Sequence, residues 1–448
     1  MYRKKDKKTQ ELFKELMPWG GKLNENNRWL RLRDLIPWDE LETEYSKYFS
    51  ENRGRPGLDS QMVIGTICIK HMLKFSDEDA VEQVLENPYM QAFCGLESFA
   101  TETLFNNSSL SKLRKRLGKK YFRQLENKVL EVLKERKIIK ARGVMVDATI
   151  FPSNIGFPTD VGLLNEVREW LVKQIKEIRN SVGAKWIRTR CRKAREQYLS
   201  FSKKRKKTKK AVIEITKKML QHVRRNKEQV IELIEEIRIK GIKVKEVIHK
   251  KIEIIKILLK QQLDMYRRKS HIVKDRIVSY SQPEVRPMVR GKAGKPVEFG
   301  PKAELSLVDG YLFLDRLSFD NFNEAKKLEE SIKKYEERFE KKPQKIIADG
   351  IYGNRDNRNY LKGEQIRAAL KPLGRKSKTE EYQKEKRWIK KQQRIRNRIE
   401  GFIGHAKEHF GLNKIRYKID GGAEIWVRMS LLMMNLDTAL KSRRYTVA

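Results

Sequence analysis

The chain contains few of the residues that build cross-links or zinc sites. Among its 448 residues there are three cysteines and six histidines. The cysteines are Cys68, Cys94 and Cys191, and they lack the paired Cys/His spacing of a zinc site. The sequence therefore predicts neither a structural zinc centre nor a disulfide framework, and a reducing compartment fits.

Long apolar runs are also lacking. No stretch approaches the roughly 18 uninterrupted apolar residues that a membrane-spanning helix needs. The first residues, Met1-Tyr-Arg-Lys-Lys, show no apolar core of a secretion signal. We therefore expect a cytoplasmic protein that neither spans a membrane nor is secreted.

Acidic residues are scarce relative to basic ones. The chain has 101 Lys and Arg against 59 Asp and Glu, a formal net charge of +42 and a pI of about 10.0. An excess this large indicates a polyanionic partner, and nucleic acid is the common one. A solvated basic surface is the alternative, which a smaller excess would favour. With 39% hydrophobic residues, the chain can still bury a sizeable core.

The first 140 residues have helical patterns separated by polar breaks. Asp59 is an expected N-cap for an apolar helix over residues 59–73, and shorter helical patterns follow as far as Leu117. Short helices joined by tight turns are typical of helix-turn-helix DNA-binding modules, and a plain bundle with a basic face is the alternative. We assign residues 1–140 to a helical N-terminal region for DNA binding and oligomerisation.

A long helical segment interrupts the strand-forming sequence. Between residues 163 and 266, apolar residues recur at the i, i+3, i+4, i+7 spacing of a helix face. The pattern predicts two or more long antiparallel helices, with a turn at Gly241. Its basic run at residues 203–210 is either a phosphate contact or a solvated loop. We assign residues 161–275 to a helical insertion and residues 141–160 with 276–448 to a catalytic domain.

Strands and helices alternate toward the C-terminus. Asp309-Gly310 between two apolar runs predicts a β-hairpin. A helix over 323–339, strands over 345–348 and 366–370, a basic linker over 375–391 and a helix carrying Glu400 are expected after it. This order predicts an α/β fold, with a mixed sheet flanked by helices.

Three carboxylates far apart in the sequence are the candidate catalytic residues. Asp147 and Asp349 each close a short apolar run of the kind that forms a buried strand, so both are expected at strand ends facing a cleft. Glu400 lies on the late basic helix. Carboxylates gathered there can hold divalent metal, and in so basic a protein the expected substrate is a phosphodiester backbone.

Two Mg²⁺ ions are the predicted cofactors, and Mn²⁺ could substitute. Mg²⁺ prefers oxygen ligands, and two ions roughly 3.5–4 Å apart stabilise both the entering and the leaving oxygen of an in-line displacement. Asp147 is the candidate bridging ligand, Asp349 would complete the shell of one ion, and Glu400 that of the other. A metal-bound water or a DNA 3′-hydroxyl would then be the nucleophile.

Two cations flank Glu400 on one helix face. Arg396 precedes it by four residues and Lys407 follows it by seven, so the three side chains form one stripe. We predict that Arg396 and Lys407 bind the scissile phosphate beside the metal. A surface Arg396–Glu400 ion pair with a separate lysine is the alternative.

The set Asp147, Asp349 and Arg396-x3-Glu400-x6-Lys407 resembles the DDE transposases of bacterial insertion sequences, in the group with a Tyr-x2-Arg-x3-Glu-x6-Lys signature. Gln393 stands where that signature has tyrosine. The resemblance implies a ribonuclease-H-like catalytic fold and Mg²⁺-dependent cleavage at terminal inverted repeats. It also implies attack of the freed 3′-hydroxyl on target DNA by a homodimer bound to double-stranded DNA, in the cytoplasm and associated with the bacterial nucleoid.

Two other functions would use the same chain. A site-specific metal-dependent endonuclease without strand transfer shares every carboxylate with a transposase. A catalytically inert, transposase-derived DNA-binding protein would retain the basic character but would have no reason to retain all three acids.

Overall fold

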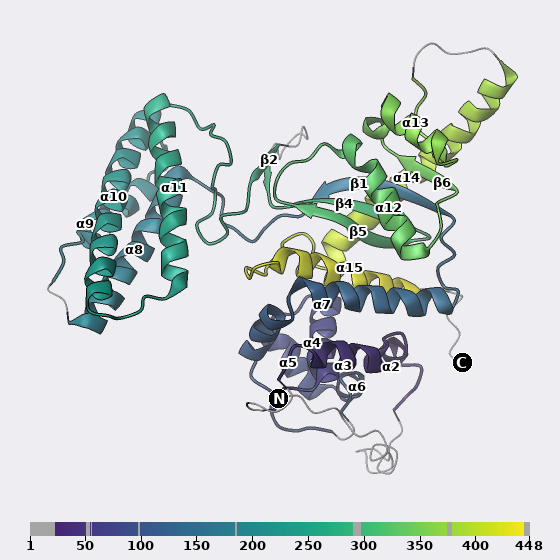
Figure 1. Ribbon diagram of the computed structural model, residues 1–448, viewed down its shortest axis with the longest axis horizontal. Coiled ribbons are helices and arrows are strands. Elements are labelled where there is room, and N and C mark those ends of the chain that lie inside the picture. The colour runs from purple at the N-terminus through teal and green to yellow at the C-terminus, as the bar shows by residue number, and fades with distance from the viewer. Residues whose placement is uncertain are drawn as a thin grey trace. The chain divides into compact units, whose positions relative to one another are not determined.

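The computed structural model describes residues 23–50, 54, 56–96, 99–183, 186–289, 297–373 and 379–442. Its contacts group the chain into two compact units, one of Met1–Ser153 with Pro301–Ala448 and one of Asn154–Gly300 (Figure 1). Each unit has its own cluster of buried apolar side chains. The assignment of the N-terminal helices, the catalytic domain and the insertion to separate functions stays a prediction.

The N-terminal part of the first unit is helical, as predicted. Its helices are α2 (Arg28–Arg33), α3 (Trp38–Ser46), α4 (Ser60–Leu73), α5 (Asp77–Glu86), α6 (Pro88–Phe93) and α7 (Ser108–Glu135). Asp59 caps α4 as expected, because its carboxylate accepts a hydrogen bond from the Met62 amide at 2.8 Å. Gly118 interrupts α7 with a φ of 61°, which glycine adopts without strain.

A five-stranded mixed sheet forms the centre of the first unit, in the order β5-β4-β1-β6-β7. Its strands are β1 (Gly143–Ile150), β4 (Lys302–Val308), β5 (Tyr311–Ser318), β6 (Lys345–Ala348) and β7 (Arg367–Ala369). β1 pairs antiparallel with β4 and parallel with β6. The predicted hairpin is confirmed between β4 and β5, where Asp309 and Gly310 have φ values of 51° and 95°.

Helices flank this sheet, so the mixed α/β class is confirmed. They are η2 (Glu324–Lys327), α12 (Leu328–Phe339), η3 (Gly350–Tyr352), α13 (Arg355–Gly363), α14 (Glu380–His409) and α15 (Gly422–Lys441). α12 packs on β1, β4 and β5, whereas α14 packs on β1, β6 and β7. These contacts make α14 the element that can bring side chains to the middle of the sheet.

The predicted basic linker at 375–391 is wrong over most of its length. Residues 374–378 lie outside the described residues, but the chain is helical from Glu380. Thr379 caps this helix by accepting from the Tyr382 amide, and Glu380 pairs with Lys384 at 2.8 Å. Glutamates four residues before lysines stabilise an exposed helix, so a charged run of this kind need not be a loop.

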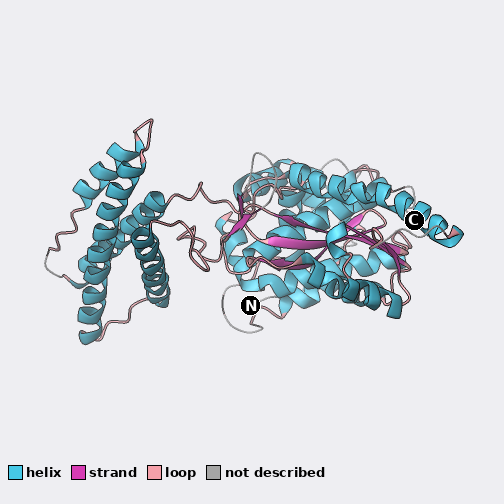
Figure 2. Cartoon of the chain, turned by 90° about the horizontal axis from the view of Figure 1, so that it is seen from above, coloured by secondary structure: helices cyan, strands magenta, loops and turns pink. Residues whose placement is uncertain are grey.

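The second unit consists mainly of α8 (Asp160–Val182), α9 (Cys191–Ser202), α10 (Lys209–Ile239) and α11 (Glu246–Arg268). Figure 2 shows these as long helices, which confirms the predicted helical segment. Gly241, with a φ of 72°, lies in the expected turn. A two-stranded antiparallel ribbon of β2 (Pro287–Val289) and β3 (Val297–Phe299) completes the unit.

Asn435 on α15 covers the open edge of the sheet. β5 is an edge strand, and the Asn435 side chain both accepts from the Leu312 amide and donates to the Leu312 carbonyl, each at 2.9 Å. Unpaired edge groups would otherwise be available to another strand. α15 also packs on α4 and α7, so it joins the N-terminal helices to the sheet (Figure 1).

Asn435→Ala should destabilise the protein strongly. Asn435 is only 4% exposed, so its removal leaves two buried backbone groups without partners, at a cost of about 2–4 kcal/mol of unfolding free energy. Urea titration measures the loss. Thr438→Ala on the same helix is the control, since its hydroxyl bonds only to the Met434 carbonyl of that helix. Equal losses in both variants would show that the amide does not secure the edge.

Candidate active site

The pairing of β1 with β6 brings two of the predicted carboxylates side by side. Val146 pairs with Ala348 in the parallel register, so the next residues are Asp147 within β1 and Asp349 directly after β6. Adjacent strands lie roughly 4.8 Å apart. Asp349 follows the last residue of β6, as predicted.

The prediction that Asp147 closes its strand is wrong. β1 continues to Ile150, because Ala148, Thr149 and Ile150 keep pairing with β4 after β6 has ended. Asp147 therefore projects from the face of the sheet within a strand. It remains next to the end of β6 because β6 is the shorter strand.

α14 covers the face of the sheet from which Asp147 projects. Side chains alternate along a strand, so Asp147 shares its face with Thr149 two positions on. The Lys407 ammonium donates to the Thr149 hydroxyl at 3.0 Å. Lys407 is thus brought to the same part of the sheet as Asp147, as the sequence predicts.

Glu400 and Arg396 form an ion pair beside this position. Their side chains lie 3.1 Å apart, and Glu400 is 56% exposed whereas Arg396 is 18% exposed. Both charges act on Asp147, because Arg396 lowers its pKa and Glu400 raises it. The ion pair given as the alternative to phosphate binding is therefore present, and it lies within electrostatic reach of Asp147.

Asp147 has a strongly perturbed carboxyl group. Burial is the largest cause and raises its pKa from 3.8 to about 6, with Glu324 and Glu400 adding to the rise. A hydrogen bond from the Ala148 amide at 2.9 Å and the charge of Arg396 oppose it. Asp349, in contrast, is exposed and accepts from the Gly350 amide at 2.7 Å.

The three predicted carboxylates do not form a closed metal site in this conformation. Among the described residues, no three His, Cys, Asp or Glu side chains lie close enough to hold an ion together. In this conformation Glu400 is paired with Arg396, and Asp349 accepts from the Gly350 amide. Asp147 and Asp349 are nevertheless oxygen donors of the kind that Mg²⁺ prefers, and a cation would compete with Arg396 for Glu400.

Gln393 anchors α14 to the ends of two strands. Its side-chain amide donates to the carbonyl of Ala348 at 3.1 Å and also to the carbonyl of Ala369. Ala348 directly precedes Asp349, so the anchor lies beside the candidate site. The sequence marked this position only as the place where the signature has tyrosine.

A second set of acidic groups was missed in the sequence. Glu304 on β4 is buried, and burial is the largest cause that raises its pKa to about 8. It accepts a hydrogen bond from the Tyr352 hydroxyl at 2.6 Å. Glu324, which pairs with Lys302 at 2.7 Å, raises the pKa of both Glu304 and Asp147. No spacing rule singles out Glu304, because its strand carries no motif with the other acidic residues.

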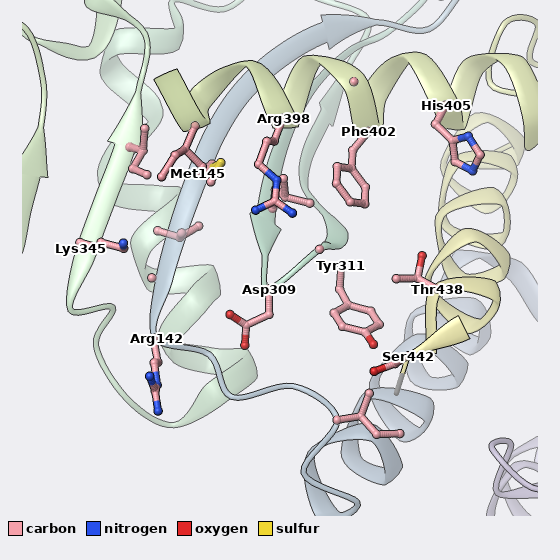
Figure 3. A pocket seen from close by; sticks show the side chains of 18 of the residues that line it. Arg142, Met145, Asp309, Tyr311, Lys345, Arg398, Phe402, His405, Thr438 and Ser442 are labelled. Atoms are coloured by element: carbon pink, nitrogen blue, oxygen red, sulfur yellow. The ribbon is translucent and has the colours of Figure 1, made fainter. Parts of the chain in front are cut away.

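A cavity of about 1040 Å³ lies against α14, the start of β1 and the β4–β5 hairpin. Figure 3 shows Arg398 and Phe402 directed from this helix toward Asp309 and Tyr311 of the hairpin. Arg398 is two residues before Glu400, about 200° around the helix, so the two side chains leave opposite sides. The cavity is lined by none of the three predicted carboxylates.

Comparisons with known proteins show which family the chain is similar to. A family model described as "Transposase domain (DUF772)" matches residues 18–116, and one described as "Transposase DDE domain" matches residues 346–437. The chain is 30% identical over 158 residues to "Uncharacterized protein ORF8 in nfe locus" of Rhizobium meliloti, which covers 35% of this chain and 76% of that protein. No solved structure matches.

The mixed sheet and the matched transposase domains define an enzyme of the transposase class. The chain belongs to the DDE transposases of insertion sequences. Transposases act on DNA, and their DDE domains in general depend on divalent metal. In the described part of the chain, every helix is too short or too polar to cross a membrane.

Gln393→Ala should loosen the contact between α14 and the sheet. The substitution leaves the carbonyls of Ala348 and Ala369 without this donor, which we expect to cost about 1–3 kcal/mol of unfolding free energy. Chemical denaturation measures it. Arg394→Ala, at the exposed neighbouring position, is the control and should cost less than about 0.5 kcal/mol. A variant as stable as the control would contradict the anchor.

Asp147→Asn should stabilise the protein at neutral pH. Because the folded-state pKa of Asp147 is raised from 3.8 to about 6, ionisation disfavours the folded state as the pH rises through this interval. The penalty is complete above the folded pKa and amounts to about 3 kcal/mol at most. Urea titrations at pH 4 and pH 8, without divalent ions, should show a gain for the variant only at pH 8. The exposed control Asp420→Asn should show a smaller difference, and a gain at pH 4 alone would refute the assignment.

Proposed function

We propose that the protein binds the terminal inverted repeats of an insertion sequence, cleaves each end by two-metal-ion phosphodiester chemistry and joins the freed 3′-hydroxyl to target DNA. The observation that supports this most is the parallel pairing that aligns Asp147 with Asp349 beneath α14. The order of the mixed sheet, with an aspartate inside its central strand, supports a ribonuclease-H-like catalytic fold.

In this proposal Asp147, Asp349 and Glu400 hold two Mg²⁺ ions, for which Mn²⁺ can substitute. The ions would lower the pKa of the attacking hydroxyl or water and neutralise the charge that develops on the phosphate. Asp147 must lose its proton to act as a ligand, so the raised pKa of its carboxyl makes ligation dependent on pH.

Arg396 and Lys407 would bind the scissile phosphate. Glu400 occupies Arg396 in the present conformation, at 3.1 Å. If Glu400 turned toward a metal ion, the guanidinium of Arg396 would be released, and two of its N–H donors would match the geometry of a phosphate. Lys407 already lies beside Thr149 on the same face. One rotation of Glu400 would thus complete the ligand set and free a phosphate-binding group.

The helical N-terminal region would recognise the DNA ends and support a homodimer on them. The transposase-domain match over residues 18–116 supports a role for this region in the same process. α15 packs on both these helices and β5, so DNA bound by the N-terminal helices would be held at a fixed position relative to the sheet.

Asp147→Ala and Glu400→Ala should each abolish cleavage while preserving DNA binding. The purified protein is incubated with a labelled element end and a target plasmid in Mg²⁺ or Mn²⁺, and nicked and joined products are separated on gels. We expect a loss of at least about 10³-fold, with DNA affinity equal or higher because a repelling carboxylate is gone. Glu385→Ala on the same helix is the control for charge removal and should remain active.

The products also distinguish the rival functions. Joined products support the transposase, and nicked DNA without joined products would favour an endonuclease. DNA binding by the unaltered protein without any cleavage would favour an inert binding protein. Cleavage by the Asp147→Ala, Asp349→Ala double variant would refute the assigned site.

A further inference from the structure

The second unit has a larger share of the positive charge than its length accounts for. Residues 154–300 contain 39 Lys and Arg against 16 Asp and Glu. Several of these acids are already paired with lysines on the same helix, such as Glu214 with Lys218 and Glu236 with Lys240. Most of the cations therefore have no acidic partner available within the unit.

Five cations gather where α9 begins against α8 and α10. We call them the α9 cation cluster, and its members are Arg168, Arg190, Lys193, Arg195 and Arg225. Arg195 lowers the pKa of Arg168, Arg190 lowers that of Arg225, and four of the five cations act on the buried His222. Burial first, and then Arg225, Arg168, Arg190 and Lys193, lower the pKa of His222 to about 4. Glu169, which pairs with Arg168 at 3.0 Å, is a carboxylate in this group.

The loop that leads into α9 is fastened to α10. The Thr189 carbonyl accepts from the Arg225 guanidinium at 3.2 Å and from the Asn226 amide at 3.3 Å. The Gln229 side chain donates to the Arg188 carbonyl at 3.4 Å. The next residue, Arg190, has a left-handed φ of 54°, which is unfavourable outside glycine. These bonds hold Arg190 in place, so the cluster is ordered before any ligand binds.

Arg225 uses neutral acceptors within the cluster. Besides the Thr189 carbonyl, its guanidinium lies 2.8 Å from Nδ1 of His222, whose Nε2 lies 3.0 Å from the Gln197 amide oxygen. This arrangement needs a neutral imidazole that accepts at Nδ1 and donates at Nε2. Because the acceptors carry no charge, repulsion within the cluster is not relieved there, and an anion lying against it would be stabilised.

The cluster continues into an exposed basic surface. Arg190, Lys193 and Arg195 are exposed, and the basic run at residues 203–210, which follows α9, is exposed throughout. α9 is 12 residues long, or roughly 18 Å, which is comparable to about five phosphates along one DNA strand. A ligand with regularly repeated negative charges fits a surface of this length better than a single anion does.

We propose that the α9 cation cluster and the basic run after it bind the sugar–phosphate backbone of double-stranded DNA, independently of its sequence. The inference rests on the proposed function only in taking duplex DNA as the substrate. Phosphate contacts of this kind add affinity and fix position, whereas they supply no base recognition. The helical unit would thus hold duplex DNA outside the recognised end sequence.

Charge reversal on the exposed part of the cluster tests this proposal. The full-length variant Arg190→Glu, Lys193→Glu, Arg195→Glu is compared with the control Lys250→Glu, Lys256→Glu, Lys260→Glu, which makes the same charge change on exposed positions of α11. Affinity for a 60-base-pair duplex of unrelated sequence is measured by fluorescence anisotropy over a series of salt concentrations.

We expect the cluster variant to bind the duplex at least about tenfold more weakly. We also expect the magnitude of the slope of log affinity against log salt to fall by about 2–3, because each lost phosphate contact removes about 0.9 from it. The control should lose less than about threefold. Equal losses of affinity in both variants would overturn the proposal, because net charge alone would then explain them. An unchanged affinity of the cluster variant would overturn it as well. If the triple variant does not fold by circular dichroism, Arg190→Gln, Lys193→Gln serves in its place.

A second measurement separates this proposal from the proposed function. At saturating protein, the cluster variant should still cleave a short duplex that contains only the element end, because its catalytic residues are intact. Failure of the unaltered protein to cleave would count against the proposed function and leave the binding result as it stands. Binding of the duplex by the variant as tightly as by the unaltered protein would count against the cluster alone.

Discussion

The register of β1 against β6 is the constraint on which the candidate site depends. Val144 and Val146 are buried on the side of β1 opposite Asp147, and Ile346 and Ala348 are buried along β6. A shift of either strand by one residue would exchange its two faces and turn the carboxylate into the core. The apolar packing that stabilises the sheet therefore also determines where the two aspartates meet.

α14 provides the opposing wall of the site and couples its parts. Gln393 secures the helix to the ends of β6 and β7, Lys407 reaches Thr149, and the Arg396–Glu400 pair lies between these two anchors. These two contacts secure the C-terminal half of α14, and the exposed Glu400 side chain lies between them in its ion pair with Arg396. In the proposed function, this backbone would hold the site in place while Glu400 exchanges Arg396 for a metal ion.

Stability and chemistry oppose each other at Asp147. A buried carboxyl group that prefers its proton disfavours the folded state at neutral pH, yet the same burial would exclude water from around an ion in the proposed site. Glu304 repeats this situation nearby, although the Tyr352 hydroxyl gives it a partner. Sites that hold such groups rely on stability from elsewhere in the fold. The contact of Asn435 on α15 with the edge strand β5 contributes to that stability.

The sequence predicted features whose causes are local. The Asp309-Gly310 turn, the Asp59 cap and the helix faces of the second unit all depend on neighbouring residues, and each is present. The length of β1 was missed because its continuation past Asp147 depends on pairing with β4, more than 150 residues later. The start of α14 was missed because its charge pattern suits either an exposed helix or a linker.

Part of the candidate site lay beyond any pattern in the sequence. Spacing placed Arg396, Glu400 and Lys407 on one stripe, but it could not show that Glu400 would turn to Arg396 rather than to the aspartates. Glu304 and Tyr352 meet only because β4 and η3 are adjacent in the fold. Contacts of this kind arise from packing between distant segments of the chain, and residue spacing in a single sequence does not reveal them.

The helical spacing of Gln393, Arg396, Glu400 and Lys407 has a genetic consequence. Each added or deleted residue between them would rotate everything that follows by about 100° and carry Lys407 away from Thr149. Functional copies of such an element could therefore differ by amino-acid substitutions along α14, but not by in-frame insertions or deletions within it. The exposed turn between α10 and α11 is free of that restriction, so length variation among descendants should accumulate there.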